Sequence, residues 1–173
     1  MQKKPTGIER SFGDDEIIVS KTDLTGRITY ANEIFLRVSG YSEKEALGAP
    51  HSMIRHPDMP RSVFQVLWDR LRAGKEIFAY VVNLAKNGDH YWVFAHVTPS
   101  FDASGKIIGF HSNRRVAQDK PRRTMEGLYA VLRGEEARQP DKASAVRAGV
   151  ARLEAELAKA GVSYDEFIFA GLT

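Results

Sequence analysis

The spacing of apolar residues changes several times along the chain, and each change indicates a different element. Ile17, Ile18 and Val19 form a short β-rich run, and residues 27–31 alternate between polar and apolar as a second strand would. The stretch between them, residues 23–26, reads Asp-Leu-Thr-Gly and has the composition of a turn. The pattern therefore predicts a β-hairpin at the start of the folded part.

Short helical segments follow this hairpin. Asn32 can cap one turn of helix that stops at Gly40, and Ser42 with Glu45 has the spacing of a capping box for a second turn. A longer helix is predicted after Pro60 because apolar side chains recur there at helical spacing. These side chains are Val63, Phe64, Leu67, Trp68 and Leu71.

Three strand-like runs come next, at about residues 76–86, 90–101 and 105–116. Asn87-Gly88 is a typical tight hairpin turn between the first two runs, and residues 102–105 form a looser turn between the last two. Two strands, short helices, one longer helix and three strands give an α+β class. We expect a five-stranded antiparallel sheet with the helices on one face.

The remaining chain divides into an N-terminal arm, residues 1–15, and a helical C-terminal extension, residues 119–173, around a central domain at 16–118. The arm is polar, so we expect it to be flexible or to dock on a partner surface. The extension shows two stretches of helical spacing. Its last apolar run, residues 164–169, is costly to leave in water and is predicted to dock.

Composition narrows the class of protein. The chain has 173 residues, of which 43% are hydrophobic, and this suits one modest domain with a tail. The sequence contains no Cys, which excludes disulfides, thiolate metal sites and cysteine nucleophiles. No apolar run approaches the roughly 18 residues of a membrane span, and a net charge of +3 is too small to indicate nucleic-acid binding. We expect a cytoplasmic protein with no direct membrane span.

The element order and four sequence words resemble a PAS domain, and more narrowly the sensory PAS domains of aerotaxis receptors, over about residues 16–133. The resemblance implies a PAS fold and a cytoplasmic module that binds FAD and reports oxygen or redox state to a chemotaxis transducer. Its most specific part is the string from Arg55 to Pro60. The words are TYAN at 29–32, VSGY at 38–41, PHSMIRHPDMP at 50–60 and KNGDHYWV at 86–93.

The chain departs from aerotaxis receptors in two respects. Those receptors carry a membrane anchor, a HAMP domain and a methyl-accepting domain, none of which follows here, so a stand-alone sensor that signals to a separate protein is expected. Ile77 occupies a position where the aerotaxis pattern usually has Trp. This difference changes the expected environment of the flavin.

The resemblance and the residue types together give a predicted cofactor site. Trp68 lies on the sheet-facing side of the long helix and could stack on an aromatic ring system, although a plain core role explains it equally well. Arg55 and His56 lie between two helical segments, where an Arg fork and backbone donors can hold phosphate oxygens. Asp58 could orient Arg55 or simply cap the next helix.

Asn83 shares a strand face with small apolar residues, so its amide needs a partner there. In flavin-binding PAS domains of the LOV type, an Asn at the matching place bonds the flavin edge, and His111 matches the Gln that meets the ring near N5. We therefore expect His111 to sense redox state, unless it faces solvent. Asn32 and His51, which lie in the matching words, are assigned to the same site. A LOV photocycle is excluded because it needs a Cys.

Other functions remain open at this stage. A haem needs only one axial histidine, and His51, His56 or His111 could supply it. A PAS domain without a cofactor could act through dimerisation or docking alone. We find no catalytic constellation, so an enzyme is not expected. A basic run could dock an acidic partner helix or could be a solvated face. It consists of Arg114, Arg115, Lys120, Arg122 and Arg123.

Overall fold

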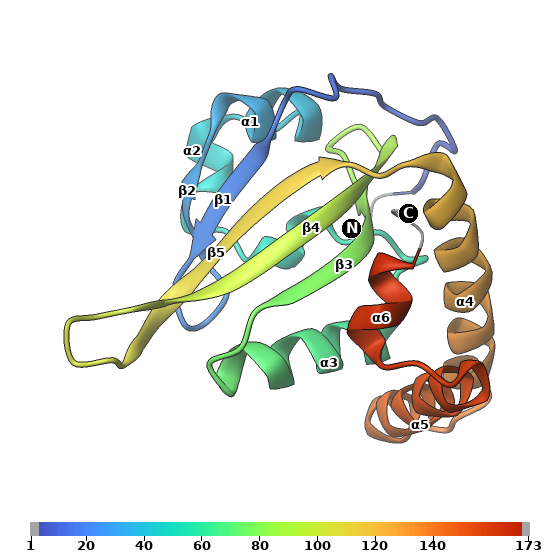
Figure 1. Ribbon diagram of the computed structural model, residues 1–173. Coiled ribbons are helices and arrows are strands. Elements are labelled where there is room, and N and C mark those ends of the chain that lie inside the picture. The colour runs from blue at the N-terminus through green and yellow to red at the C-terminus, as the bar shows by residue number, and fades with distance from the viewer. Residues whose placement is uncertain (1–3, 171–173) are drawn as a thin grey trace.

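The computed structural model describes residues 4–170, and it shows the predicted five-stranded sheet (Figure 1). The strand order is β2-β1-β5-β4-β3, and every strand pairing in it is antiparallel. The sheet and the α+β class are confirmed. The strands are β1 (Ile18–Thr22), β2 (Ile28–Ala31), β3 (Ile77–Leu84), β4 (His90–Phe101) and β5 (Ile107–Val116).

Four helical segments between β2 and β3 cover one face of the sheet, which we call the inner face. Asn32 caps the first of them by accepting a hydrogen bond from the backbone N–H of Phe35, and the predicted capping box at Ser42 and Glu45 is present. The apolar stripe of the longest helix faces the sheet and builds part of the core. The segments are α1 (Glu33–Ser39), α2 (Glu43–Ala46), the 3₁₀ helix η1 (His51–Ile54) and α3 (Arg61–Arg72).

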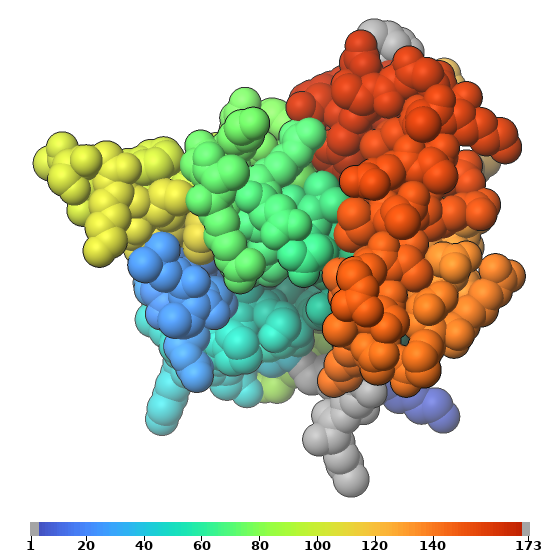
Figure 2. All heavy atoms as spheres, turned by 90° about the horizontal axis from the view of Figure 1, so that it is seen from below, coloured from blue at the N-terminus to red at the C-terminus, as the bar shows by residue number. Residues whose placement is uncertain are grey.

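The C-terminal extension forms α4 (Asp119–Ala137), α5 (Lys142–Ala160) and α6 (Tyr164–Phe169). Helices α4 and α6 pack on the opposite, outer face of the sheet: Tyr129 donates a hydrogen bond to the carbonyl of Tyr80 at 2.5 Å, and Tyr164 donates to that of Phe78 at 3.0 Å. Figure 2 shows α5 beside α3. The predicted docking of residues 164–169 is confirmed, since Ile168 is fully buried.

The N-terminal arm packs on its own domain, which corrects the expectation that its order requires a partner surface. The backbone N–H of Thr6 bonds the carbonyl of Gly88, and that of Arg10 bonds the carbonyl of His90. Asp89 accepts hydrogen bonds from Thr6 Oγ1 at 2.7 Å and from Arg10 Nε at 3.1 Å. The carboxylate of Asp89, at the turn between β3 and β4, therefore holds residues 6–10 in place.

Between Lys4 and Ala170, none of the helices combines the length and the apolar character needed to cross a membrane.

Candidate functional site

A cavity of about 170 Å³ lies between α3 and the inner face of the sheet. Strand alternation directs one set of side chains toward it from β3, β4 and β5, and α3 supplies the opposite wall. The lining is mainly apolar with a few polar groups, which is typical of a small-molecule site. Its apolar residues are Ile54, Phe64, Leu67, Trp68, Leu71, Val81, Ala95, Val97 and Phe110.

Trp68 and Phe110 form the aromatic part of this wall. Their ring centroids are 5.2 Å apart and their planes meet at 77°, an edge-to-face arrangement. Trp68 is only partly buried. It packs against the core cluster that contains Leu67 and Leu71, and it also lines the cavity. The predicted position of Trp68 on the sheet-facing side of the helix agrees with this geometry.

Asn83 is the polar group that β3 presents to the cavity. The residue is only 4% exposed, and none of residues 4–170 accepts a hydrogen bond from its Nδ2. A buried donor left without an acceptor costs about 1–3 kcal/mol. The amide therefore indicates a ligand that offers an acceptor atom inside the cavity.

Arg114, on β5, enters the same cavity from its other side. It is 2% exposed, donates to Ser20 Oγ and lies 5.4 Å from the ring of Phe35. Its Nε and Nη1 find no acceptor among the described residues. Burial lowers the pKa of Arg114 to about 10, and the hydroxyl of Tyr91 offsets only part of this effect. The guanidinium thus offers two further donors to an electron-rich ligand.

His51 lies beside this pair, with its Nε2 3.1 Å from Ser20 Oγ. Burial, with a smaller contribution from the charge of Arg114, lowers the pKa of His51 to about 3. The imidazole is therefore neutral near pH 7. Arg55 borders the cavity at its mouth, and its guanidinium lies 4.2 Å from the centroid of Phe64.

Three predicted site residues lie outside the cavity. The amide of Asn32 is occupied by backbone, accepting from Val19 N–H at 3.0 Å and donating to the carbonyl of Ile17 at 2.8 Å, so it fixes α1. His56 is buried next to His90, and its Nδ1 accepts from the backbone N–H of Asp58. The carboxylate of Asp58 is exposed and lies near Arg133 of α4.

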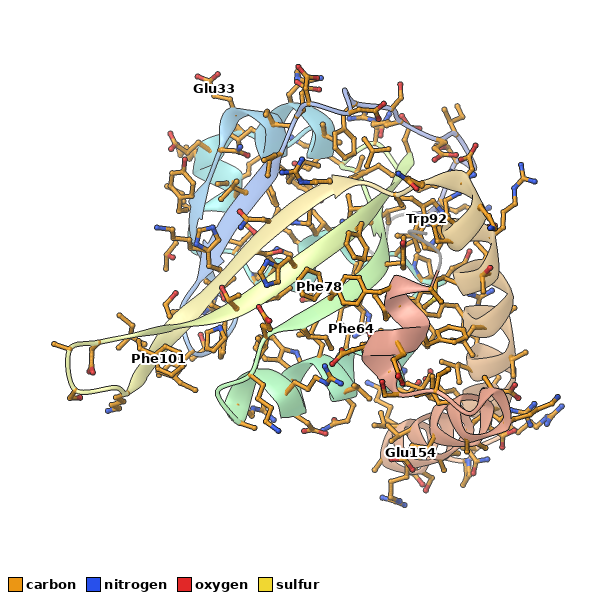
Figure 3. All side chains as sticks on the ribbon, viewed as in Figure 1. Glu33, Phe64, Phe78, Trp92, Phe101 and Glu154 are labelled. Carbon is orange, nitrogen blue, oxygen red and sulfur yellow. The ribbon has the colours of Figure 1, made fainter. Side chains whose placement is uncertain are left out.

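His111 borders the cavity, but its imidazole lies on the outer face of the sheet. It bonds Asn113 at 3.2 Å, two positions along the same strand, whereas Phe110, Ser112 and Arg114 share the inner face. The expectation that this imidazole meets a flavin is therefore corrected: side chains alternate along β5, and this alternation places the His111 imidazole on the face opposite Phe110, Ser112 and Arg114. Figure 3 shows the sheet with the side chains on its two faces.

The residues missed by sequence reasoning are Ser20, Ser112 and Arg114. The expectation that Arg114 belongs to an exposed basic run is wrong, because β5 continues through it and turns it inward. Arg122 is also not free, since it pairs with Glu9, Asp119 and Glu126. The sequence signal that could have found Ser112 and Arg114 is the alternation along β5, which places them on the same face as Phe110.

Comparisons with known proteins agree with this fold. The family described as PAS fold matches residues 28–114. The aerotaxis receptor of Escherichia coli (strain K12) is 43% identical over 139 residues, which are 80% of this chain and 27% of the receptor. The nitrogen fixation regulatory protein of Klebsiella pneumoniae is 30% identical over 99 residues, 57% of this chain and 20% of that protein. The chain thus spans about a quarter or less of the length of these two relatives.

Among solved structures, the light-state structure of the blue-light photoreceptor Aureochrome1 LOV is similar, with a TM-score of 0.57 and 18% identity. The match covers 68% of this chain and 91% of that one. A second similar structure, "Flavin Analogue Sheds Light on Light-Oxygen-Voltage Domain Mechanism", has a TM-score of 0.56 and 19% identity over 71% of this chain and 87% of that one. At this identity the likeness concerns the fold.

Proposed function

The chain belongs to the PAS family, and on this basis we propose that it binds FAD non-covalently under α3 and signals redox or oxygen state to a chemotaxis-type transducer. In this proposal the chain is a cytoplasmic binding and signalling module and not an enzyme. The relationship to an aerotaxis receptor supports the biological role. The arrangement of the cavity supports the ligand.

The observation that carries the proposal is the buried Nδ2 of Asn83, which has no acceptor among residues 4–170. The polar edge of a flavin ring presents carbonyl and ring-nitrogen acceptors, and the aromatic wall at Trp68 and Phe110 suits the ring itself. Arg114 adds two buried donors without partners in the described chain. The donor set and the apolar wall therefore fit a flavin.

Bound flavin would supply a redox-active ring whose edge exchanges an acceptor for a donor on reduction. Asn83 can meet both forms, because its amide carries Nδ2 as a donor and Oδ1 as an acceptor. Arg114 can only donate, so it favours the form that offers an acceptor. A rotation or shift of the Asn83 amide is the response that these side chains allow.

The route from this amide to the surface is short. Asn83 lies three residues after Tyr80 on β3, and the carbonyl of Tyr80 accepts the hydroxyl hydrogen bond of Tyr129 in α4. The carbonyl of Phe78, farther along β3, holds Tyr164 of α6. A displacement of β3 would therefore shift the C-terminal helices. We propose that the transducer binds the surface that these helices form.

The test is the visible absorption spectrum of the protein purified without added cofactor, followed by heat release and chromatography of the chromophore. We expect the paired bands of oxidised flavin, bleached by dithionite, and FAD on release. A single intense Soret band would replace the proposal by haem-based gas sensing. A colourless protein that takes up no added FAD would leave a cofactor-free interaction module.

Two matched variants locate the ligand. Asn83→Ala is expected to weaken flavin binding by about three- to tenfold, because it removes the buried amide that would donate a hydrogen bond to the ligand. His111→Ala, whose imidazole lies on the outer face, is expected to retain flavin as the unmodified chain does. Equal loss in both variants would contradict the placement of the ring on the inner face.

A further inference from the structure

A second and larger cavity adjoins the first. It is a groove of about 1100 Å³ with two walls of different origin. One wall comes from η1 and the start of α3, and the other from the end of α4, the loop at 139–141 and the start of α5. Ser52 and Arg55 border both cavities, so the two spaces adjoin at these residues.

The charges that line this groove are unequal. Four basic side chains border it, and they come from both walls: Arg55, Arg61, Arg133 and Lys142. The acidic side chains along its lining within residues 4–170 are Glu136 and Asp141. This leaves two positive charges in excess along the lining, one of which, on Arg133, is partly compensated by the exposed carboxylate of Asp58, 3.9 Å from its Nε.

Both acidic groups are already engaged by the protein. Glu136 accepts hydrogen bonds from the backbone N–H groups of Arg61 and Ser62 and from Ser62 Oγ, at 2.7–3.0 Å. Asp141 caps α5 by accepting from the backbone N–H of Ser144 at 2.9 Å and from its hydroxyl at 2.8 Å. The basic groups therefore set the character of the groove toward a ligand.

The groove also has an apolar part, formed by Met53, Met59 and Leu84 beside the basic side chains. An anion attached to a flat aromatic group would use both parts, since the excess positive charge attracts the anion and the apolar patch can take the ring. A pyrophosphate joined to adenosine has this chemistry. Riboflavin, which carries no phosphate, does not.

We infer that this groove holds the pyrophosphate and adenosine half of a flavin dinucleotide, with the ring half in the cavity under α3, and that α4 and α5 form one wall of the nucleotide site. The inference rests on the proposed function and extends it. Arg55 contacts the ligand where its two halves join. Arg133 and Lys142 give the C-terminal extension a direct part in recognition.

Binding of the dinucleotide would also affect the C-terminal helices. A dinucleotide in the groove would contact the domain on one side and α4–α5 on the other, so its binding would hold the extension in place. Riboflavin, which fills only the cavity under α3, would not reach the far wall. The state of the C-terminal helices therefore depends on the nucleotide half of the ligand.

The experiment compares the affinities of the flavin-free full chain for FAD and for riboflavin, measured by quenching of flavin fluorescence. Arg133→Ala and Lys142→Ala are the test variants. Arg147→Ala is the matched control, because Arg147 is an exposed cation of α5 that bonds Ser144 and does not border the groove. Circular dichroism melts check that each variant is folded.

We expect each test substitution to raise the dissociation constant for FAD about tenfold, which corresponds to one lost charge-assisted contact, and to leave that for riboflavin within about twofold. The control should leave both constants unchanged. FAD, and not riboflavin, should also slow proteolysis at the loop 139–141.

Equal effects on FAD and riboflavin, or no effect on FAD in folded variants, would overturn the inference while the flavin proposal stands. If the unmodified chain binds neither ligand, the proposed function fails and this inference fails with it. The two failures are therefore distinguishable in one set of titrations.

Discussion

Gly149 of α5 lies at the most crowded point of the contact between the C-terminal extension and α3. A Cβ added there would lie 2.7 Å from Cβ and Oγ of Ser62 and 2.8 Å from Oε1 of Glu136. Ser62 is completely buried, and Glu136 holds the start of α3 by three hydrogen bonds. We predict that Gly149→Ala destabilises the protein although alanine is the better helix former.

The magnitude follows from opposing terms. Replacing Gly by Ala within a helix stabilises by about 1 kcal/mol. Overpacking costs about 1–3 kcal/mol, and displacing the Glu136 carboxylate weakens hydrogen bonds to a charged group worth about 1.5–3 kcal/mol. The free energy of unfolding should fall by about 1–3 kcal/mol, which for a chain of this length lowers the melting temperature by about 2–12 °C.

The assay is urea and thermal unfolding followed by circular dichroism, with Gly134→Ala as the matched control. Gly134 lies within α4, and a Cβ there would meet nothing within 4 Å. This control should raise the free energy of unfolding by up to about 1 kcal/mol. If Gly149→Ala stabilises the protein as much as Gly134→Ala does, the close packing of α5 against α3 is refuted.

Three further predictions address the remaining contacts. Tyr129→Phe removes a buried donor to the carbonyl of Tyr80 and should lower the free energy of unfolding by about 1–3 kcal/mol in urea unfolding; an unchanged value would exclude this hydrogen bond. Because the pKa of His51 is lowered to about 3, the folded state binds fewer protons than the unfolded state below about pH 6.5. The free energy of unfolding should therefore fall as the pH drops from 6.5 toward 3, by up to about 1.4 kcal/mol per pH unit. His51→Gln should reduce this dependence on pH. The same dependence in the variant would show that other groups cause it. Asp89→Ala removes the acceptor that holds Thr6 and Arg10 and should make the N-terminal arm sensitive to limited proteolysis. An arm that stays uncleaved in this variant would contradict the role of these contacts.

Much of the fold follows from local signals in the sequence. The Asn87-Gly88 turn, the capping residues Asn32 and Ser42 and the apolar stripe of α3 each depend on residues close in the chain, so their physics is complete within a short window. The sheet-facing side of Trp68 and the inward amide of Asn83 follow from the same periodicities. These signals are enough to predict the α+β class and part of the site.

The tertiary structure alone decided the placement of His111 and Arg114. Side chains alternate along a strand with a period of two, so the phase of β5 decides which of the two enters the cavity, and that phase is fixed by pairing with β1 and β4. Likewise, the groove at Arg55 exists only because α4 and α5 return to α3 from more than 70 residues away, through the contacts of Glu136 with Ser62. Such packing depends on surfaces that are distant in sequence, and no local pattern encodes their meeting.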